Sequence, residues 1–244
     1  METLIKRLLC AVILVAAIPG LVAADELRGR LFDKGKKAGN NLEGYVVWLK
    51  DGRDLPRLKH RKTVNEMLQI DKQFSPRFLA ILKGEIILFA NFDNVFHNVF
   101  SLDKRNRFDL GLYKGEKRFS ADLMTEIKDA GDPVQSYPEV GKFHVFCNIH
   151  PDMWGVVYVF DHGYYAVTDK HGLFVLPSPG KGAYTVMIDG PKLSRPEKRR
   201  IEIRDGSANL KLDLGLQESA REVPHTKKDG REYGEKRPSG YLSE

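Results

Sequence analysis

Three side chains that can bind a transition metal lie on one short stretch of the chain, GKFHVFCNIHPDMW. Cys147 offers a thiolate, His150 an imidazole and Met153 a thioether, at the spacing Cys-x2-His-x2-Met. A fourth donor, the imidazole of His97, lies upstream in the apolar run NVFHNV. Together these four side chains predict a metal site.

The chemistry of the four donors favours copper over zinc. Two imidazoles and one thiolate in a trigonal arrangement, with a thioether at longer range, form the ligand set of a blue-copper electron-transfer centre. Zinc would accept His97, Cys147 and His150 in a tetrahedron. A thioether, however, is a soft ligand that suits cuprous copper better. Met153 therefore favours a single mononuclear type 1 copper site.

Each donor also has a simpler structural interpretation. Along a strand, Phe143, Val145 and Cys147 would face one side of a sheet, and a buried cysteine is more often a small core residue than a ligand. Met153 would more often pack in the core, and His97 would more often be hydrogen-bonded only. The coincidence of three donors on one loop, a fourth upstream and no second cysteine nearby favours the metal site.

The order of these motifs resembles that of the cupredoxins. The resemblance rests on residues 74–93, on HNVFS at residues 97–101 and on the Cys147 loop, whose short spacing is closer to the amicyanin type than to the plastocyanin type. Bacterial proteins often labelled methylamine-utilisation or plastocyanin-like proteins carry similar HNVFS, FDLGLY and CNIHPDM motifs. The resemblance covers roughly residues 63–160.

This resemblance implies an all-β fold, a Greek-key β-sandwich that binds copper through the four donors. It also implies that Asn98, directly after the first ligand, ties the two ligand-bearing segments together, which would fix ligand orientation. Pro151 removes a backbone donor beside His150 and stiffens the loop. Three aromatic side chains would keep the site dry or simply pack the core: Phe96, Phe146 and Trp154.

The first 24 residues have the pattern of a secretory signal. Lys6 and Arg7 precede an apolar run and a small-residue cleavage site, and the run is too short to span a membrane comfortably. We expect cleavage before Asp25, a periplasmic or secreted protein, and no membrane span in the mature chain. Cleavage also removes Cys10, so Cys147 remains alone in an oxidising compartment, where a metal would occupy it.

Composition excludes several other functions. The formal charge of +6 falls by one with the signal, and acidic and basic residues are interspersed, so nucleic-acid binding is not expected. The basic residues 50–62 favour a solvated loop over a docking patch for an acidic partner. The sequence has no phosphate loop, HExxH run, paired zinc cysteines or dinucleotide fingerprint. A thiol nucleophile at Cys147 would leave Met153 unexplained, so we expect no enzyme.

The regions on either side resemble two halves of a smaller, carboxypeptidase-regulatory-like or prealbumin-like β-sandwich. Residues 27–33 and 45–49 have strand patterns around a turn, and residues 164–190 alternate strand and turn at short spacing. We therefore expect strand pairing between residues 46–49 and 164–214, with the cupredoxin part inserted between the halves.

The expected division of the chain has five parts: signal peptide 1–24, first strands of the regulatory-like sandwich 25–62, cupredoxin domain 63–160, remainder of the sandwich 161–216, and a charged, extended tail 217–244. Cupredoxin strands are expected at residues 67–70, 78–82, 86–90 and 95–101, and the FDLGLY motif follows at residues 108–113. Residues 121–140 form an insertion that departs from the compact family pattern.

These features predict a single-electron carrier. Electrons would pass through the edge of His150, which the resemblance makes the ligand nearest the surface, to or from a dehydrogenase or a c-type cytochrome. Two alternatives stay open: a copper-binding or delivery protein without redox cycling, and a module that binds a partner in the cell envelope.

Overall fold

The computed structural model describes residues 26–34, 42–50, 52–56, 58, 64–115, 134–136, 139–204, 208–214 and 223–234. In these ranges the chain is all-β, as predicted, with one 3-10 turn, η1 (Gly52–Asp54). No helix in these ranges is long and apolar enough to cross a membrane. The expected signal, most of the insertion and most of the tail fall outside the described residues, as do residues 51, 57 and 59–62 of the basic stretch.

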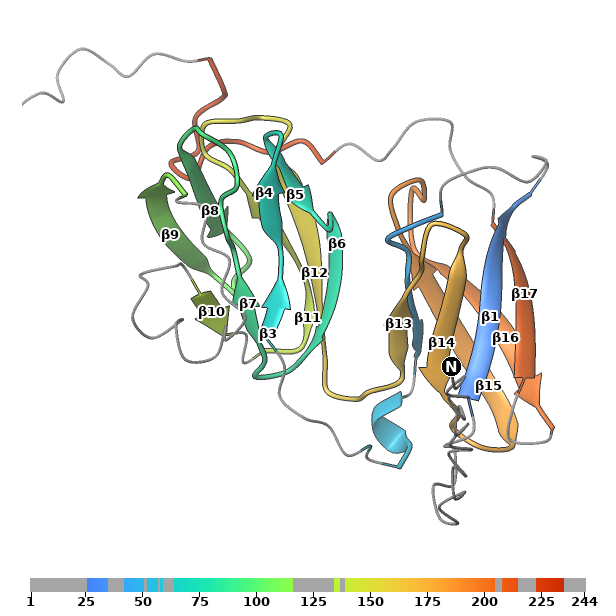
Figure 1. The fold of residues 1–244 in the computed structure, drawn as a ribbon. Coiled ribbons are helices and arrows are strands. Elements are labelled where there is room, and N and C mark those ends of the chain that lie inside the picture. The colour runs from blue at the N-terminus through green and yellow to red at the C-terminus, as the bar shows by residue number, and fades with distance from the viewer. Residues whose placement is uncertain are drawn as a thin grey trace, which may run out of the picture.

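Figure 1 shows two β-structures side by side, and the chain passes from one to the other and back. The first, which we call the outer sandwich, contains the first and the last strand of the described chain. One of its sheets has the strand order β14 (Leu173–Pro177), β1 (Glu26–Asp33), β17 (Ala208–Leu214). The other has the order β13 (Tyr165–Val167), β2 (Val46–Leu49), β15 (Gly182–Asp189), β16 (Glu197–Ile203).

Strand pairing in the outer sandwich connects segments that are far apart in the sequence. β1 pairs antiparallel with β14 and parallel with β17. β2 pairs with β13 and β15, although the whole second β-structure lies between them in the chain. Apolar side chains such as Leu27 and Leu31 alternate with exposed arginines along β1 and fill the space between the sheets.

The second β-structure, the inner sandwich, carries the candidate metal donors. Its strands are β6 (Phe78–Leu82), β12 (Trp154–Phe160), β11 (Gly141–Phe146), β8 (His97–Ser101) and β9 (Phe108–Tyr113) in one sheet, β10 (Val134–Ser136), β7 (Ile86–Leu88) and β3 (Val64–Glu66) in another, and the hairpin β4 (Leu68–Ile70), β5 (Gln73–Ser75). Strand β6 has the predicted bounds, and β9 coincides with the FDLGLY motif. β8 begins two residues later than predicted, at His97.

The alternation of side chains along β11 explains how the sequence builds two cores. Phe143 and Val145 enter the same hydrophobic cluster as Cys147, and Phe146 enters the cluster on the opposite face, as predicted. β12 is buried along its whole length because both of its faces are covered.

A hydrophobic interface with a buried carboxylate joins the two sandwiches. Trp48 of β2 packs against Tyr158 and Phe160 of β12, with ring centroids 5.5 and 5.8 Å apart. At the end of β15, the fully buried carboxylate of Asp189 accepts a hydrogen bond from the Tyr158 hydroxyl and pairs with Lys142 Nζ at 2.7 Å. Because Lys142 lies on β11, the outer sandwich is connected to the strand that leads to Cys147.

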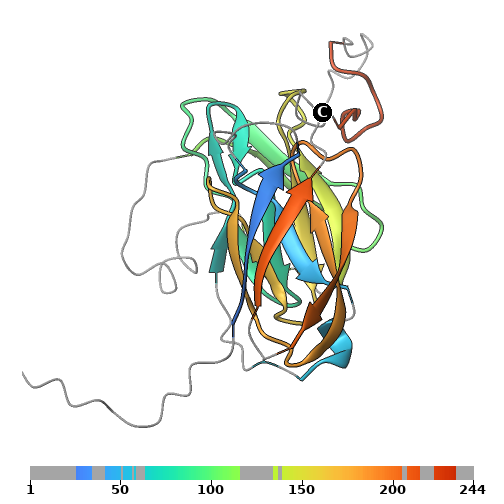
Figure 2. The same cartoon turned by 90° about the vertical axis from the view of Figure 1, so that its right-hand side faces the viewer.

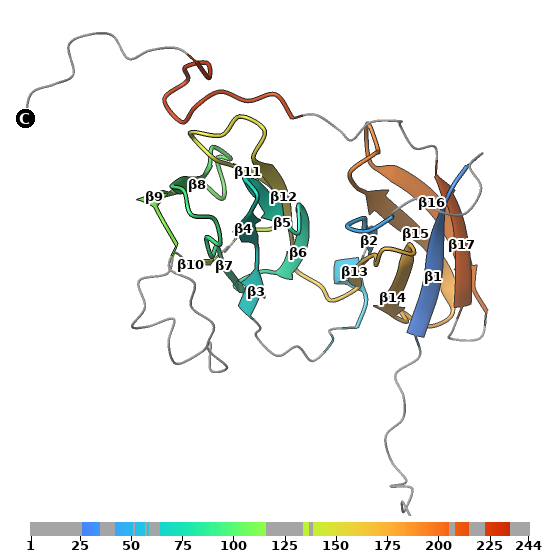
Figure 3. The same cartoon turned by 45° about the horizontal axis from the view of Figure 1, so that its top comes forward.

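Residues 223–234, which we call the strap, follow the outer sandwich and have neither helix nor strand. The strap lies across the β11–β12 loop of the inner sandwich, as the views in Figures 1, 2 and 3 agree. The sequence predicted an extended chain here. It did not predict that this part of the tail would be packed against the loop.

We expect Asp189→Asn to lower the free energy of unfolding by about 2 kcal/mol, because it leaves the partly buried Lys142 ammonium without its counter-charge. Guanidinium-induced unfolding measures the change. Asp213→Asn, an exposed position on β17, is the matched control and should stay within about 0.5 kcal/mol of the unaltered protein. Equal stability of the two variants would contradict a role for Asp189 in joining the sandwiches.

Candidate metal centre

Two adjacent strands bring the candidate donors together. His97 is the first residue of β8, and Cys147 and His150 lie on the loop that follows β11. The antiparallel register pairs Phe100 with Phe146. If this register is continued along both strands, His97 lies opposite the loop that follows Cys147. The sheet itself therefore sets the distance between the two ligand-bearing segments.

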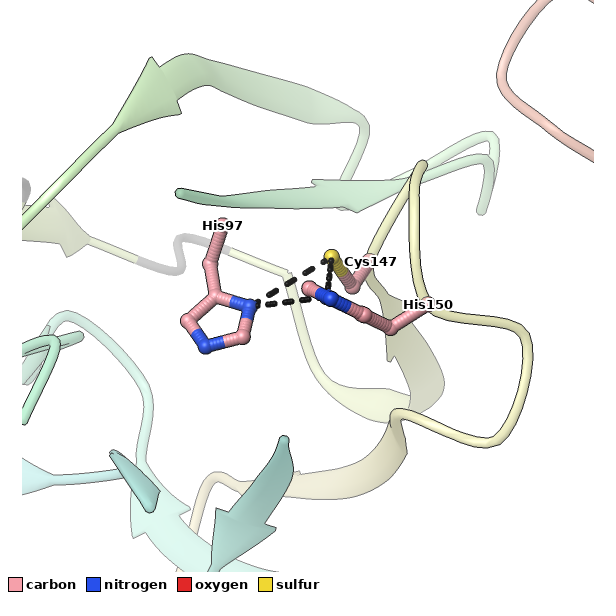
Figure 4. Close-up of side chains that lie close together, drawn as sticks. All are labelled: His97, Cys147 and His150. Carbon is pink, nitrogen blue, oxygen red and sulfur yellow. Dashed lines mark hydrogen bonds between the residues drawn. The ribbon is translucent and has the colours of Figure 1, made fainter. Parts of the chain in front are cut away.

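Figure 4 shows His97, Cys147 and His150 pointing toward one another. The two Nδ1 atoms are 3.0 Å apart, and Cys147 Sγ lies 3.9 Å from Nδ1 of His97 and 3.5 Å from Nδ1 of His150. A point equidistant from the three atoms lies about 2.0 Å from each, close to ordinary metal–nitrogen and metal–sulfur bond lengths. The spacing of the three donors therefore fits a single metal ion.

Asp93 sets the orientation of the His97 ring. Nε2 of His97 lies 2.7 Å from Asp93 Oδ2, so the Nε2–H donates to the carboxylate and Nδ1 is turned toward Cys147 and His150. This is the arrangement that fixes tautomer and ring direction in metal-ligating histidines. Sequence reasoning missed Asp93, although its position four residues before His97 was a possible signal.

Asp93 is itself held by a tight turn. The backbone N–H groups of Asp71 and Lys72 both donate to its carboxylate at 2.8 Å. These residues have φ values of 52° and 57°, in the left-handed region that non-glycine residues rarely adopt. Burial opposes ionisation of Asp93, but the hydrogen bonds from Lys72, His97 and Asp71 outweigh it and lower the pKa of the carboxyl below its ordinary value. Asp93 therefore remains an anion facing His97.

The cluster also favours a thiolate. Burial raises the pKa of the Cys147 thiol, but hydrogen bonds from His97 and from the backbone N–H groups of Asn98, Ile149 and His150 lower it, and the net shift is downward. Burial lowers the pKa of His97, whereas the hydrogen bonds to Cys147 and Asp93 raise it to a net upward shift. The two shifts have opposite signs, as expected for an imidazole and a thiol that are hydrogen-bonded to each other.

Asn98 connects the two ligand-bearing segments. Its Oδ1 accepts a hydrogen bond from the Asn148 backbone N–H at 3.1 Å, and its Nδ2 donates to Asp109 at 2.7 Å. Since Asn98 follows His97 and Asn148 follows Cys147, this bond holds the two ligands at a fixed separation.

Met153 and Pro151 lie on the same loop as Cys147. Met153 is fully buried in the hydrophobic cluster that contains Cys147. Its backbone closes the loop, because Cys147 N–H donates to Met153 O at 3.0 Å and Met153 N–H donates to His150 O at 3.1 Å. Ligation by the Met153 thioether stays a prediction. Pro151 is exposed at the turn of the loop.

One expectation about the surroundings of the site is wrong. Phe146 and Trp154 are buried, but Phe96 is 51% exposed and does not seal the site. The reason is alternation: His97 begins β8 with its ring inward, so the preceding side chain points the other way.

Comparisons with known proteins add structural neighbours only. No protein-family model matches the chain, and no curated protein matches it. The chain is similar to a mutant of amicyanin in its Cu(I) form (16% identity, 40% of this chain and 82% of that chain, TM-score 0.32). It is also similar to a purple cupredoxin from Nitrosopumilus maritimus (21% identity, 39% of this chain and 99% of that chain, TM-score 0.30). At these TM-scores the similarities carry no argument about function, which has to come from the site.

Asp93→Asn should lower the affinity for copper by about 10- to 100-fold, because His97 loses the anion that fixes its ring. Competition with a calibrated chelator measures the affinity. Asp161→Asn makes the same chemical change at an exposed position and should leave the affinity unchanged. Equal affinities for both variants would show that Asp93 does not orient the ligand.

Proposed function

We propose that this protein is a type 1 copper protein of the cupredoxin kind that carries single electrons in the periplasm. The observation that carries the proposal is the preformed cluster of one cysteine sulfur and two imidazole nitrogens, with spacings of 3.0 to 3.9 Å, in which His97 and Cys147 are fully buried. Copper bound there would supply a one-electron exchange between its cuprous and cupric states.

The surrounding residues support transfer of electrons rather than transfer of the metal. His97 and Cys147 are fully buried, and Asp93 and Asn98 hold the segments that carry them. Because both ligands are shielded from water and held by hydrogen bonds, a bound ion is expected to be retained rather than released. A fixed geometry also reduces the movement that a change in metal charge would otherwise require.

His150 provides the route to the surface. It is partly exposed, whereas His97 is fully buried. The apolar residues beside the two histidines in the sequence are unusually exposed: Ile149 by 45%, Phe96 by 51% and Val95 by 38%. Exposed apolar side chains close to the ligands in the sequence suit contact with a transient protein partner. We propose that the partner is a redox protein, either a dehydrogenase or a c-type cytochrome.

The copper-loaded protein is expected to show an intense visible band from thiolate-to-cupric charge transfer that disappears on reduction, and the paramagnetic resonance spectrum of a type 1 site. Cys147→Ala should abolish the band, and His171→Gln, an exposed histidine of the outer sandwich, should leave it unchanged. If the protein binds copper but shows no such band, or if a chelator removes the copper at once, the protein would instead be a delivery protein.

Ile149→Lys should slow electron self-exchange between oxidised and reduced copies by about ten-fold, because it places like charges at the contact between the two copies. Line broadening in nuclear magnetic resonance spectra of mixed oxidation states measures the rate. Leu173→Lys, an equally exposed apolar residue on β14, is the control. An unchanged rate with Ile149→Lys would place electron exit elsewhere than the His150 edge.

A further inference from the structure

The strap makes a closed ring of hydrogen bonds with the residues next to two of the ligands. Lys228 N–H donates to Asn148 Oδ1 at 2.9 Å, and Lys228 Nζ lies 2.5 Å from Asp109 Oδ2. Asp109 accepts from Asn98 Nδ2 at 2.7 Å, and Asn98 Oδ1 accepts from Asn148 N–H at 3.1 Å. The strap therefore completes the connection between the segment after His97 and the segment after Cys147.

A second group of contacts fixes the strap to the backbone of a ligand. The Tyr233 hydroxyl donates to the Cys147 carbonyl at 2.5 Å and lies 2.9 Å from His225 Nε2. The His225 ring stacks on Phe146, with centroids 4.0 Å apart and planes at 22°.

The two groups of contacts differ in what they contribute. The Lys228–Asp109 ion pair is exposed by 42% and 39% on its two side chains, so its net contribution to stability is small. The Tyr233 hydrogen bond and the His225 stack are more shielded from water and act directly on the loop. Tyr233 holds the carbonyl of Cys147 and the Lys228 backbone holds the side chain of Asn148, both from outside, while the sulfur faces inward to the histidines.

We infer that the strap is a positioning element of the metal site, and that Tyr233 is its principal positioning residue. By holding the Cys147–His150 loop closed, it keeps the three donors at their spacing and keeps solvent and reagents away from the thiol. The inference rests on the proposed function only in treating the cluster as a copper site. The clamp on the loop exists without the metal and can be measured without it.

The first test uses metal-free protein that lacks residues 1–24, in which Cys147 is the sole cysteine. Cys147 is fully buried, so iodoacetamide reacts only when the loop opens. Tyr233→Phe keeps the ring and removes one hydrogen bond, and should speed alkylation by about three- to ten-fold. Deletion of residues 223–244 should speed it further. Tyr184→Phe, whose hydroxyl bonds Pro179 and Lys181 carbonyls in the outer sandwich, is the matched control.

The second test uses the copper-loaded protein. Tyr233→Phe should shift the visible band and release copper to a chelator several-fold faster, while Tyr184→Phe matches the unaltered protein. A general loss of stability would lower the thermal unfolding midpoint of either variant without moving the band, so the band identifies an effect on ligand position.

The outcomes separate the two proposals. If the unaltered protein shows no charge-transfer band but Tyr233→Phe still speeds alkylation, the copper proposal fails and the clamp on the loop stands. If the band is present but both strap variants match the unaltered protein in alkylation rate, band position and copper release, the strap inference alone is overturned.

Discussion

Three electron-rich donor atoms within 3.9 Å of one another repel each other in a dry pocket unless a positive charge lies among them. The rest of the inner sandwich maintains this arrangement. Asp93 turns one imidazole inward from one side, and Asn98 holds the two ligand-bearing segments together. In a preformed site of this kind, the unfavourable free energy of bringing the donors together is offset during folding. It therefore does not weaken the binding of a metal.

The two sandwiches contribute to the site in different ways. The inner sandwich supplies every candidate ligand, and its strand register sets their separation. The outer sandwich supplies no ligand within the described residues, yet its Asp189 binds Lys142 on the strand that leads to Cys147. The strap then returns from the outer sandwich to the loop after that strand. The outer sandwich therefore contacts the strand that leads into the Cys147 loop, and the strap contacts the outer surface of the same loop.

The sequence predicted the parts of the structure that depend on short-range patterns. The closeness of Cys147 and His150 could be predicted, because two side chains that are three residues apart in a turn cannot lie far from each other. The apolar run that forms β6 was also predicted with its bounds. The spacing of Asp93 and His97 was a possible signal, but the hydrogen bonds that hold Asp93 come from a left-handed turn at Asp71 and Lys72, which the sequence pattern did not indicate. The strap was missed because a charged, aperiodic segment gives no signal of the surface on which it packs.

The parallel pairing of β1 with β17 affects the order in which a newly made polypeptide can assemble. Every sheet partner of the inner sandwich lies within residues 64–160, so this part can form while synthesis continues. β1 keeps an unpaired edge until β17, the last strand of the described chain, has been made, and such non-local pairings form slowly. The strap comes later still. A prematurely terminated product would thus contain every candidate ligand but lack the segment that closes over them.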